Sequence, residues 1–570
     1  MNTKSLVLGF ELSTQSAKWV VLDTSAADRE ENHGGNGAIV HSGSFEFDDV
    51  FPDYGTHGGV LITEDPQLRH APARLYLDAL DEIFRRITDA GVSTADIGAI
   101  KCDAHQHCTV YSDETLPARL AALASTGVTA VEAGQGRGSS SDDADERGRD
   151  ESLSGGSLAS RIGPAFTRHS VPTWEDRTTG EQADALTGEL ARVGGIETLT
   201  GNRAELRFPA AQIIRWAQSD PQDYARTAHV QLLSAFLTSV LTGHVAPVDT
   251  GDGWGTNLNH IDIENPGFSA EAIAATAKVA GWERPHKLQA QLGGMVAYDT
   301  PVGTVNEYFA RNYGVARDAV VLAGTGDNPA TLLGVGDGAL VSMGSSYTVC
   351  GPMETVTPSS EGSYNVFGYR PGYAMALTVI TNGGKLHREF CETYAGGDWE
   401  QYAKLAGSRE IDPDREPLML PYLSDESVPT ARAGIVRDGF DESEARANVR
   451  ALHLSQVASM RLHSQHLANV ERVNVVGGGA ANQLLREGIA DAFGATVTAA
   501  AHASLAAPFG CALSAARHLL GCKYYHVIDM FAAGADETPA DSTQSERWKR
   551  LVERYAGLEA SVVGNMKPGA

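Results

Sequence analysis

Basic residues are scarce in this chain. It carries 45 lysines and arginines against 72 aspartates and glutamates, so its formal charge at pH 7 is −27. A protein this acidic repels nucleic-acid phosphates and anionic lipid headgroups, and we therefore expect neither nucleic acid nor a membrane among its partners. A nucleoside triphosphate would need local compensation of its charge by a metal ion and by backbone N–H groups.

Cysteines and long apolar runs are also few. The six cysteines lie scattered without C-x-x-C spacing, which predicts buried free thiols in a reducing compartment. No stretch approaches the roughly 18 consecutive apolar residues that span a bilayer. The apolar run at residues 5–10 is too short for a signal peptide, so the expected location is the cytoplasm.

Two similar hairpins suggest how the chain is organised. At 570 residues the chain exceeds what one hydrophobic core usually supports, so two domains are expected. Apolar strands flank a hydroxyl-rich turn at residues 13–16, and residues 338–350 repeat that pattern around a Gly-Ser-Ser turn. The repeat predicts two related α/β domains, residues 1–335 and residues 336–570.

One segment differs from its surroundings in composition. Residues 132–160 are rich in Gly, Ser, Asp and Glu. Such a segment cannot bury enough apolar area to order itself. We expect a flexible acidic insertion in the first domain, with periodic structure resuming near Thr173.

Three segments have the composition of phosphate-binding turns. Ser/Thr turns between strands can present concave arrays of N–H groups to phosphate oxygens, although either turn taken alone is more typical of an ordinary hairpin. The glycine triplet 477–479 lies between a predicted strand at 473–476 and a predicted helix at 483–493. Taken together, the two turns and this junction favour a nucleotide-binding protein.

An acidic residue follows a buried strand at residues 319–323. The sequence there is Gly324-Thr325-Gly326-Asp327-Asn328-Pro329, and open α/β sheets bind ligands at such strand ends. If Pro329 starts a helix, the helix N-terminus lowers the pKa of Asp327 and keeps it ionised. A simple helix-capping role for Asp327 is equally compatible with the spacing.

Two further polar segments allow more than one interpretation. His105-Gln106-His107 lacks the partners of a metal site, which leaves hydrogen bonding to a polyhydroxylated substrate or an ordinary polar loop. Asp249 and Asp252 imitate a calcium loop but lack its distal Glu. A structured Gly/Asp loop is the favoured interpretation.

Nine segments occur in the order seen in one enzyme family. They are LGFELSTQSAKWVVLD, FPDYGTHGGV, HQHCTVY, WEDRTTGEQ, LTGNRAELRF, APVDTGDGWGTNL, GTGDNPATLLG, SMGSSYT and VVGGGAANQLL. In this order they resemble the FGGY sugar kinases, and within them the xylulose kinases of eukaryotic type. The likeness covers nearly the whole chain except the acidic insertion.

The resemblance implies a fold, a reaction and a set of site residues. It implies two actin-like, ribonuclease-H-like ATPase domains, with the sugar and the catalytic base in the first domain, the nucleotide in the second, and ATP and sugar meeting in the cleft between them. The implied reaction is ATP-dependent phosphorylation of D-xylulose to D-xylulose 5-phosphate, with Asp327 as general base. The implied sugar contacts are His107, Arg207, Asp327 and Asn328. The implied nucleotide contacts are Ser13, Thr14, Ser345, Ser346, Trp399, Gly478, Gly479 and Asn482.

One residue departs from the family pattern. Relatives carry Asp where this chain has Glu11, and that carboxylate is thought to help hold the Mg²⁺ that accompanies ATP. Glu is one methylene longer, and a misplacement of about 1 Å can cost on the order of 100-fold in rate, although a longer arm can also act through water. Three alternatives therefore stay open: a kinase for another pentulose such as ribulose, an actin- or chaperone-like ATPase that binds protein partners, and a non-catalytic sugar sensor. The oligomeric state, a homodimer included, is left open as well.

Overall fold

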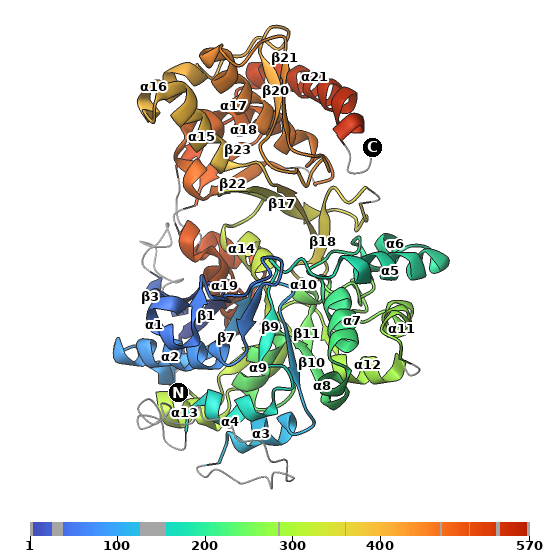
Figure 1. Cartoon of the computed structure of the whole chain (residues 1–570). Helices are drawn as coiled ribbons and strands as arrows, with labels where there is room; N and C mark the ends of the chain where they lie inside the picture. The colour runs from blue at the N-terminus through green and yellow to red at the C-terminus, as the bar shows by residue number, and fades with distance from the viewer. Residues whose placement is uncertain are drawn as a thin grey trace. The chain divides into compact units, whose positions relative to one another are not determined.

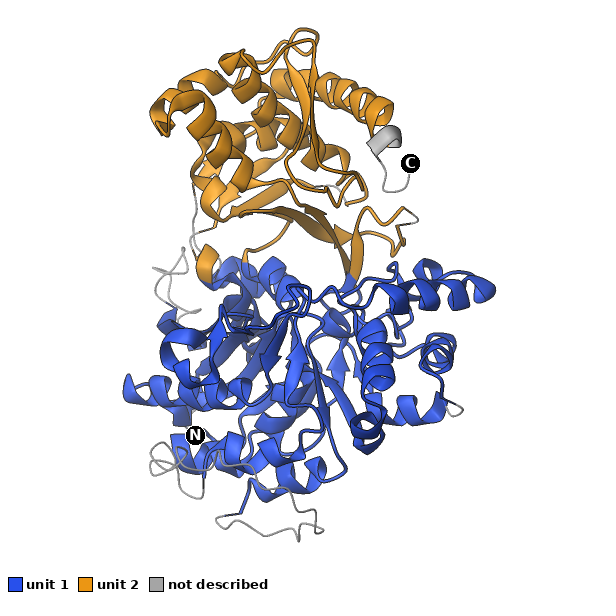
Figure 2. Cartoon of the chain, in the orientation of Figure 1, with its two compact units in different colours: residues 1–334, 367–372, 505–532 blue, residues 335–366, 373–504, 533–570 orange. Residues whose placement is uncertain are grey.

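The computed structural model describes residues 4–25, 38–125, 156–282, 285–359, 361–467, 470–500, 502–531 and 536–566. The chain forms two compact units that are each built from separate segments (Figure 2). Unit 1 comprises residues 1–334, 367–372 and 505–532, and unit 2 comprises residues 335–366, 373–504 and 533–570. The first division, after Gly334, lies near the predicted boundary, but two later segments return to unit 1, so neither unit is one continuous piece of sequence.

Unit 1 is built on a seven-stranded mixed sheet (Figure 1). Its strands are β1 (Leu6–Leu12), β2 (Ser16–Asp23), β3 (Ile39–Glu46), β7 (Ile97–Ala104), β13 (Pro301–Thr304), β14 (Val320–Leu322) and β15 (Thr325–Gly326). The order is β13-β14-β7-β1-β2-β3, and β15 also pairs with β7. β1, β2 and β3 are antiparallel neighbours, whereas β1, β14 and β15 all run parallel to β7.

The sheet of unit 2 repeats this plan. Its strands are β16 (Ala339–Met343), β17 (Tyr347–Met353), β18 (Asn365–Gly368), β19 (Ala374–Ile380), β22 (Arg472–Val476), β23 (Thr496–Ala499) and β24 (Glu537–Thr538). The order is β18-β19-β17-β16-β22-β23-β24. An antiparallel trio, β16, β17 and β19, is again followed by two parallel strands and an antiparallel outer strand. The repeated hairpin in the sequence thus corresponds to a repeated sheet topology.

Helices and short strand pairs surround the two sheets. The helices of unit 1 are α1 (Phe47–Val50), α2 (Leu75–Asp89), α3 (Leu116–Ala122), α4 (Leu158–Ile162), α5 (Gly180–Leu190), α6 (Ile196–Thr200), α7 (Pro209–Ser219), α8 (Pro221–Arg226), α9 (Leu233–Thr242), α10 (Thr250–Gly253), α11 (Ala270–Val279), α12 (Pro285–Leu292), α13 (Glu307–Tyr313), α14 (Asp327–Gly334), α19 (Ala506–Leu520) and α20 (Tyr524–Phe531). Those of unit 2 are α15 (Gly384–Ala395), α16 (Trp399–Ala406), α17 (Ala445–Leu462), α18 (Gln483–Phe493) and α21 (Ser542–Met566). The short strands are β4 (Thr56–His57), β5 (Val60–Leu61), β6 (His70–Pro72), β8 (Thr109–Ser112), β9 (Ser170–Pro172), β10 (His229–Leu232), β11 (Val248–Asp249), β12 (Met295–Val296), β20 (Leu418–Tyr422) and β21 (Gly434–Asp438).

Burial explains the central strands and one of the main helices of unit 1. Every residue of β1 and β7 is buried, as expected for strands that are covered on both faces of a sheet. The apolar residues of α2 recur at a helical period, and those at Leu80, Ile83, Phe84 and Ile87 are fully buried. These side chains belong to one core cluster together with residues of β1 and β7.

Helix α19 explains why a late segment belongs to unit 1. It packs against α14, β1 and β7, and it is apolar nearly all round, with Ala506 to Ala516 buried without a gap. Close approach depends on glycines: an added Cβ on Gly510 would lie 2.0 Å from the Ala330 carbonyl oxygen, and one on Gly334 would lie 1.8 Å from that of Ala506. A Cβ on Gly9 of β1 would likewise lie 2.0 Å from the Pro508 carbonyl oxygen.

Several sequence-based expectations are tested by these elements. The predicted helix at 483–493 coincides with α18, and the predicted strands around residues 13–16 coincide with β1 and β2. All six cysteines are free, and only Cys522 is not fully buried. Most of the predicted acidic insertion lies outside the described residues, but its last residues enter helix α4, because Ser157 caps that helix and Leu158 is buried. Of the helices described, none is both long and apolar enough to traverse a bilayer.

We expect the glycine contacts between α14 and α19 to be a main determinant of the stability of unit 1. Gly510→Ala places a methyl group against a backbone oxygen, and overpacking of this kind should lower the free energy of unfolding by about 1–3 kcal/mol. The matched control is Gly188→Ala in α5, where the added Cβ meets no atom within 4 Å. That change should raise stability by about 0.5–1 kcal/mol. Urea denaturation of both variants measures the difference, and equal stabilities would contradict the packing argument.

Candidate active site

Three carboxylates gather where parallel strands of unit 1 end. Glu11 of β1 is the register partner of Asp103 of β7, and Asp103 is the register partner of Thr325 of β15. Asp327 follows two residues later as the first residue of α14. Residues in register on parallel strands project to the same face of a sheet, so the topology brings together acids that are separated by more than 300 residues in the sequence.

Asp327 has a raised pKa, which corrects the sequence-based expectation of a lowered one. Its side chain is partly buried, and desolvation together with the charge of Glu11 raises its pKa to about 7. The backbone N–H groups of Asn328 and Gln106 and the nearby Lys18 oppose this shift. The N-terminus of α14 therefore does not determine the pKa of Asp327, because desolvation and the neighbouring carboxylate outweigh its effect.

Lys18 partly compensates this acidic cluster. Its ammonium group lies 2.9 Å from Oε2 of Glu11. Burial lowers the pKa of Lys18, but the ion pair with Glu11 outweighs this effect, and the pKa lies above its ordinary value. Asp103 is fully buried, and its pKa is raised by desolvation and by Glu11 and Asp327. The ammonium group of Lys18 thus interacts with all three carboxyl groups, those of Glu11, Asp103 and Asp327.

The same cluster could hold a hydrated metal ion. Among the residues that the structure describes, no group of three or more His, Cys, Asp and Glu side chains forms a ready metal cage. Mg²⁺ that accompanies a nucleotide usually keeps several waters and takes one or two carboxylates. Oδ1 of Asp103 is buried without a hydrogen-bond partner, and Glu11 lies beside it on β1. The oxygen donors at Glu11 and Asp103 therefore fit such an ion.

His107 lies in a tight aromatic setting beyond the end of β7. It has a left-handed backbone with φ of 72°, its ring stacks on Phe208 with centroids 4.4 Å apart, and its Nδ1 lies 2.9 Å from the Gly255 carbonyl oxygen. Desolvation and the nearby Arg207 hold the pKa of His107 well below its usual value. The imidazole is therefore neutral, and because a carbonyl only accepts, Nδ1 carries the hydrogen and Nε2 is left as an acceptor.

The other expected sugar contacts lie around the same point. Arg207 lies over the ring of Phe208 and pairs with Glu205 at 3.3 Å. Asn328 donates its amide N–H groups to Gln106 and to Asp327, at 2.8 and 3.0 Å. The four predicted sugar contacts thus form two pairs in unit 1. His107 and Arg207 share contacts with Phe208, whereas Asp327 and Asn328 are joined to each other and to Gln106, the residue before His107.

The first Ser/Thr turn is held by its own side chains. Ser13 Oγ donates to the Ser16 carbonyl oxygen at 2.8 Å and accepts from the Ser16 N–H at 3.0 Å. Thr14 Oγ1 accepts a 3.1 Å hydrogen bond from the indole N–H of Trp174. Since both side chains are engaged in this way, the backbone of the turn is the part that is suited to phosphate oxygens.

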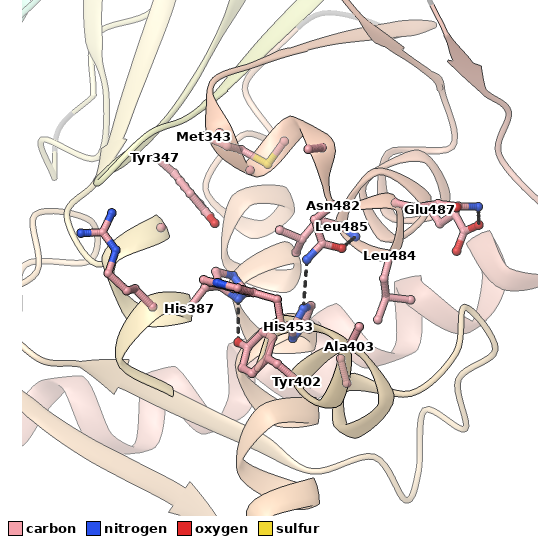
Figure 3. Close-up of a pocket in the computed structure, with 18 of the residues that line it drawn as sticks. Met343, Tyr347, His387, Tyr402, Ala403, His453, Asn482, Leu484, Leu485 and Glu487 are labelled. Carbon is pink, nitrogen blue, oxygen red and sulfur yellow. Dashed lines mark hydrogen bonds between the residues drawn. The ribbon is translucent and has the colours of Figure 1, made fainter. Parts of the chain in front are cut away.

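A cavity of about 1100 Å³ lies within unit 2 (Figure 3). Five of the expected nucleotide contacts line it: Ser345, Trp399, Gly478, Gly479 and Asn482. Ser346 lies in the same turn as Ser345, between β16 and β17, whereas Ser13 and Thr14 belong to unit 1. The volume is slightly above the range of about 300–1,000 Å³ that is typical of small-molecule sites.

The glycine triplet shapes one wall of this cavity. An added Cβ on Gly478 would meet no atom within 4 Å, whereas one on Gly479 would lie 2.7 Å from Cβ of Met343. Gly477 has a left-handed φ of 87°, which favours glycine. Asn482 caps α18, accepting from the Leu485 N–H at 3.2 Å. Its amide therefore organises the helix start beside the cavity.

Two neutral histidines also line the cavity. His387 contacts the Tyr402 hydroxyl at 2.8 Å and Gln456 Oε1 at 2.6 Å, and His453 Nε2 lies 3.3 Å from the Asn482 amide nitrogen. The first and last of these contacts are drawn in Figure 3. Desolvation lowers the pKa of His387 to about 3 and that of His453 to about 4. This part of the lining is therefore polar but uncharged at neutral pH.

Several residues in these sites were not predicted from the sequence. Lys18 and Asp103 lie in strands whose other residues are mostly apolar, and charged residues inside such strands are the signal that was available. Gln106 and Phe208 stand next to predicted contacts. His387 and His453 are isolated histidines in helices, and only the fold brings them to one cavity.

We expect the pocket histidines to make unit 2 sensitive to acid. The pKa of a histidine is about 6.5 in the unfolded chain, and that of His453 is about 4 in the folded protein. Below pH 6.5 the unfolded chain binds a proton that the folded protein does not, so stability is lost as the pH falls from about 6.5 towards 4. The His453→Gln variant should therefore lose about 1–2 kcal/mol less stability between pH 7 and pH 5 than the unchanged protein. Hydrogen exchange of α17 measures this locally. The exposed His526→Gln is the control and should keep the original pH dependence; the same dependence in the His453 variant would contradict the assignment.

Known proteins resemble this chain in sequence and in fold. Residues 339–519 match the FGGY family of carbohydrate kinases, C-terminal domain. The chain is 29% identical over 522 residues to the probable D-xylulose kinase A of Aspergillus fumigatus, covering 84% of this chain and 82% of that protein. It is 26% identical to the xylulose kinase of Rattus norvegicus, covering 98% and 97%.

A solved structure supports the fold over the same length. The xyloylose kinase of Brucella ovis superposes with a TM-score of 0.73 at 18% sequence identity, covering 98% of this chain and all of that one. At this low sequence identity the similarity supports the fold alone. That fold is the two-domain, actin-like and ribonuclease-H-like fold expected from the motifs. Residues 339–519 thus match the C-terminal domain of the FGGY carbohydrate kinases, and the chain is similar over most of its length to proteins described as xylulose kinases.

Proposed function

We propose that the chain phosphorylates D-xylulose with ATP, giving D-xylulose 5-phosphate and ADP. The observation that carries the proposal is the position of Asp327, beside Asn328 and near Glu11 at the end of parallel strands. We choose D-xylulose as the sugar because the chain is similar over most of its length to proteins described as xylulose kinases. The contacts described above do not distinguish D-xylulose from other pentuloses, so the identity of the sugar has to be tested by an activity assay.

The sugar is held by groups of complementary polarity. Nε2 of the neutral His107 accepts a hydrogen bond from a sugar hydroxyl, because Nδ1 is committed to the Gly255 carbonyl. Arg207 donates to hydroxyl oxygens, and its guanidinium is oriented by Glu205. A sugar hydroxyl both donates and accepts, so this pair can fix the ketose in one orientation.

Asp327 takes the proton from the hydroxyl that attacks the γ-phosphorus. As the new O–P bond forms, the O–H bond breaks towards the carboxylate, and the bond from the γ-phosphorus to the bridging oxygen of ADP breaks. A base is most useful when its pKa lies near the working pH. The pKa of Asp327 near 7 meets that condition, and it arises from burial and from Glu11.

The nucleotide occupies the cavity of unit 2. Gly478 leaves space for the ligand, Trp399 is 56% exposed and offers a ring for stacking, and the start of α18 follows the glycine triplet. Mg²⁺ would be held through Glu11 and Asp103 and would neutralise phosphate charge. The longer side chain of Glu11 is compatible with this role, because its carboxylate pairs with Lys18 and stays beside Asp103.

A sugar panel tests the proposed activity. Purified protein with Mg-ATP should phosphorylate D-xylulose with a higher kcat/KM than ribulose, gluconate or glycerol, and ATP hydrolysis should be slow when no sugar is present, since water must be excluded until the site is filled. A coupled ADP assay measures both. Turnover that does not depend on any sugar would indicate an ATPase of another kind, and an absence of turnover would indicate a sugar-binding protein that has lost catalysis.

Replacing the base should remove most of the turnover. Asp327→Asn keeps the size of the side chain but cannot take a proton, so kcat should fall by about 10²–10⁴-fold while sugar affinity changes little. In the unchanged protein, kcat/KM should rise with pH through about 7 as Asp327 ionises. The exposed Asp262→Asn is the control and should behave like the unchanged protein. A near-normal kcat for Asp327→Asn would assign the base elsewhere.

A further inference from the structure

We propose that Gln106 is a positioning residue that fixes which face of the Asn328 amide meets the substrate. In this arrangement Asn328 offers its oxygen, so the site selects a sugar hydroxyl that donates a hydrogen bond. The inference rests on the proposed function, because it concerns how the same site recognises its sugar. It follows from three linked contacts, each of which leaves a single choice of donor and acceptor.

The first contact begins at a backbone carbonyl. Nε2 of Gln106 lies 3.0 Å from the carbonyl oxygen of Gly251. A carbonyl oxygen only accepts, so the NH₂ end of the Gln106 amide must face it. The oxygen end of the same amide must then point the other way.

The second contact passes this orientation to Asn328. Oε1 of Gln106 lies 2.8 Å from Nδ2 of Asn328. Because an amide oxygen also only accepts, the NH₂ end of Asn328 must face Gln106. A flipped Asn328 would place two oxygens against each other, and the buried Gln106 oxygen would lose its donor.

The third contact uses the remaining N–H of Asn328. Nδ2 also lies 3.0 Å from Oδ1 of Asp327, so both amide hydrogens are engaged. Among the described residues, none donates a hydrogen bond to Oδ1 of Asn328 in this structure. When Asp327 takes a proton its contact with Asn328 weakens, whereas the contact with Gln106 is unchanged. Gln106 is therefore the partner that holds Asn328 throughout the reaction.

The carbonyl at the origin of this chain is held firmly. Gly251 lies in α10, whose N-cap Asp249 accepts the Asp252 N–H at 3.1 Å. Asp249 also pairs at 3.4 Å with Lys101, whose ammonium group donates to the Ala323 carbonyl oxygen at 2.5 Å. Asp249 and Lys101 are fully buried. Breaking such a pair leaves an uncompensated charge, so α10 has little freedom to move.

Gln106 itself has no room for a second orientation. Only 2% of the residue is exposed. An added Cβ on Gly326, the residue before the proposed base, would lie 2.5 Å from Cγ of Gln106. The side chain is therefore packed directly against the backbone that carries Asp327, and its amide is held by contacts at both ends.

The test compares sugars that can and cannot donate a hydrogen bond. Fluorine in place of a hydroxyl keeps a similar size but removes the donor, so 3-fluoro and 4-fluoro analogues of D-xylulose report which hydroxyl faces Asn328. In the unchanged protein, one analogue should lose about 10- to 100-fold in kcat/KM, as expected when a buried acceptor is left unpaired. In Gln106→Met, which keeps the side-chain length but has no hydrogen-bonding amide, the loss for that analogue should be at least about fivefold smaller. Only the contact with Asp327 then orients Asn328, and because that contact weakens as Asp327 takes the proton, Asn328 can turn its NH₂ group to the fluorine.

A buried glutamine outside the site supplies the matched control. Gln231 donates to Ser239 Oγ at 2.9 Å and to the Ala246 carbonyl oxygen at 3.2 Å. Gln231→Met should lower stability but leave the fluorine penalty as it is. Because the penalty is a ratio within each variant, a general loss of activity does not affect it.

The outcomes are distinguishable. An equal fluorine penalty in the unchanged protein and in Gln106→Met, or an equal reduction in Gln231→Met, would overturn the role of Gln106 while leaving the kinase assignment intact. A lack of D-xylulose phosphorylation by the unchanged protein would overturn the proposed function and this inference with it. A reduced penalty in the Gln106 variant alone supports the proposal.

Discussion

The buried strand β7 is the constraint on which the site in unit 1 depends. All eight of its residues are buried, and it pairs in parallel with β1, β14 and β15. Its end therefore fixes Asp103 against Glu11 and carries the chain into His105, Gln106 and His107. A one-residue slip in register would turn every side chain to the opposite face. The strand thus determines both the fold of unit 1 and the positions of its reactive groups.

The same strand carries a buried lysine, which an apolar strand would not need for stability. Lys101 is fully buried, lies over the ring of Tyr298, and is satisfied by Asp249 and the Ala323 carbonyl. Burial of an ion pair is seldom a source of stability, because the loss of water offsets the attraction. Here the pair links β7 to Asp249, the last residue of β11 and the N-cap of α10, and to Ala323, which follows β14. Its effect is to fix the geometry of three segments that meet at the site.

Much of the fold was predictable from the sequence, because local patterns decide it. The hairpins and helix α18 follow from hydrophobic periodicity and turn residues, and the repeated hairpin pointed to repeated domains. Sequence spacing could not show that α19 returns to unit 1, since that depends on glycine contacts with α14 and β1. It also gave the wrong direction for the pKa of Asp327, because the decisive neighbour, Glu11, is 316 positions away in the sequence. The orientation of Asn328 was beyond reach for the same reason: it is set by a carbonyl in α10 through a glutamine after β7.

The acidic composition of the chain hides a local balance of charge. A net charge of −27 would repel a triphosphate at long range. The cavity of unit 2, however, is lined by three cationic residues, Lys385, Arg388 and Arg409, and by one carboxylate, Glu487. Its histidines are neutral and do not add to that charge at neutral pH. Arg409 pairs with Asp491, whereas the ammonium group of Lys385 donates to the hydroxyl of Ser424 at 2.7 Å. Lys385 lies beside the Ser345 turn, because its backbone N–H donates to the Ser345 carbonyl oxygen. Cations concentrated at one cavity and carboxylates concentrated at the strand ends of the other unit give each substrate a local environment that the net charge does not describe.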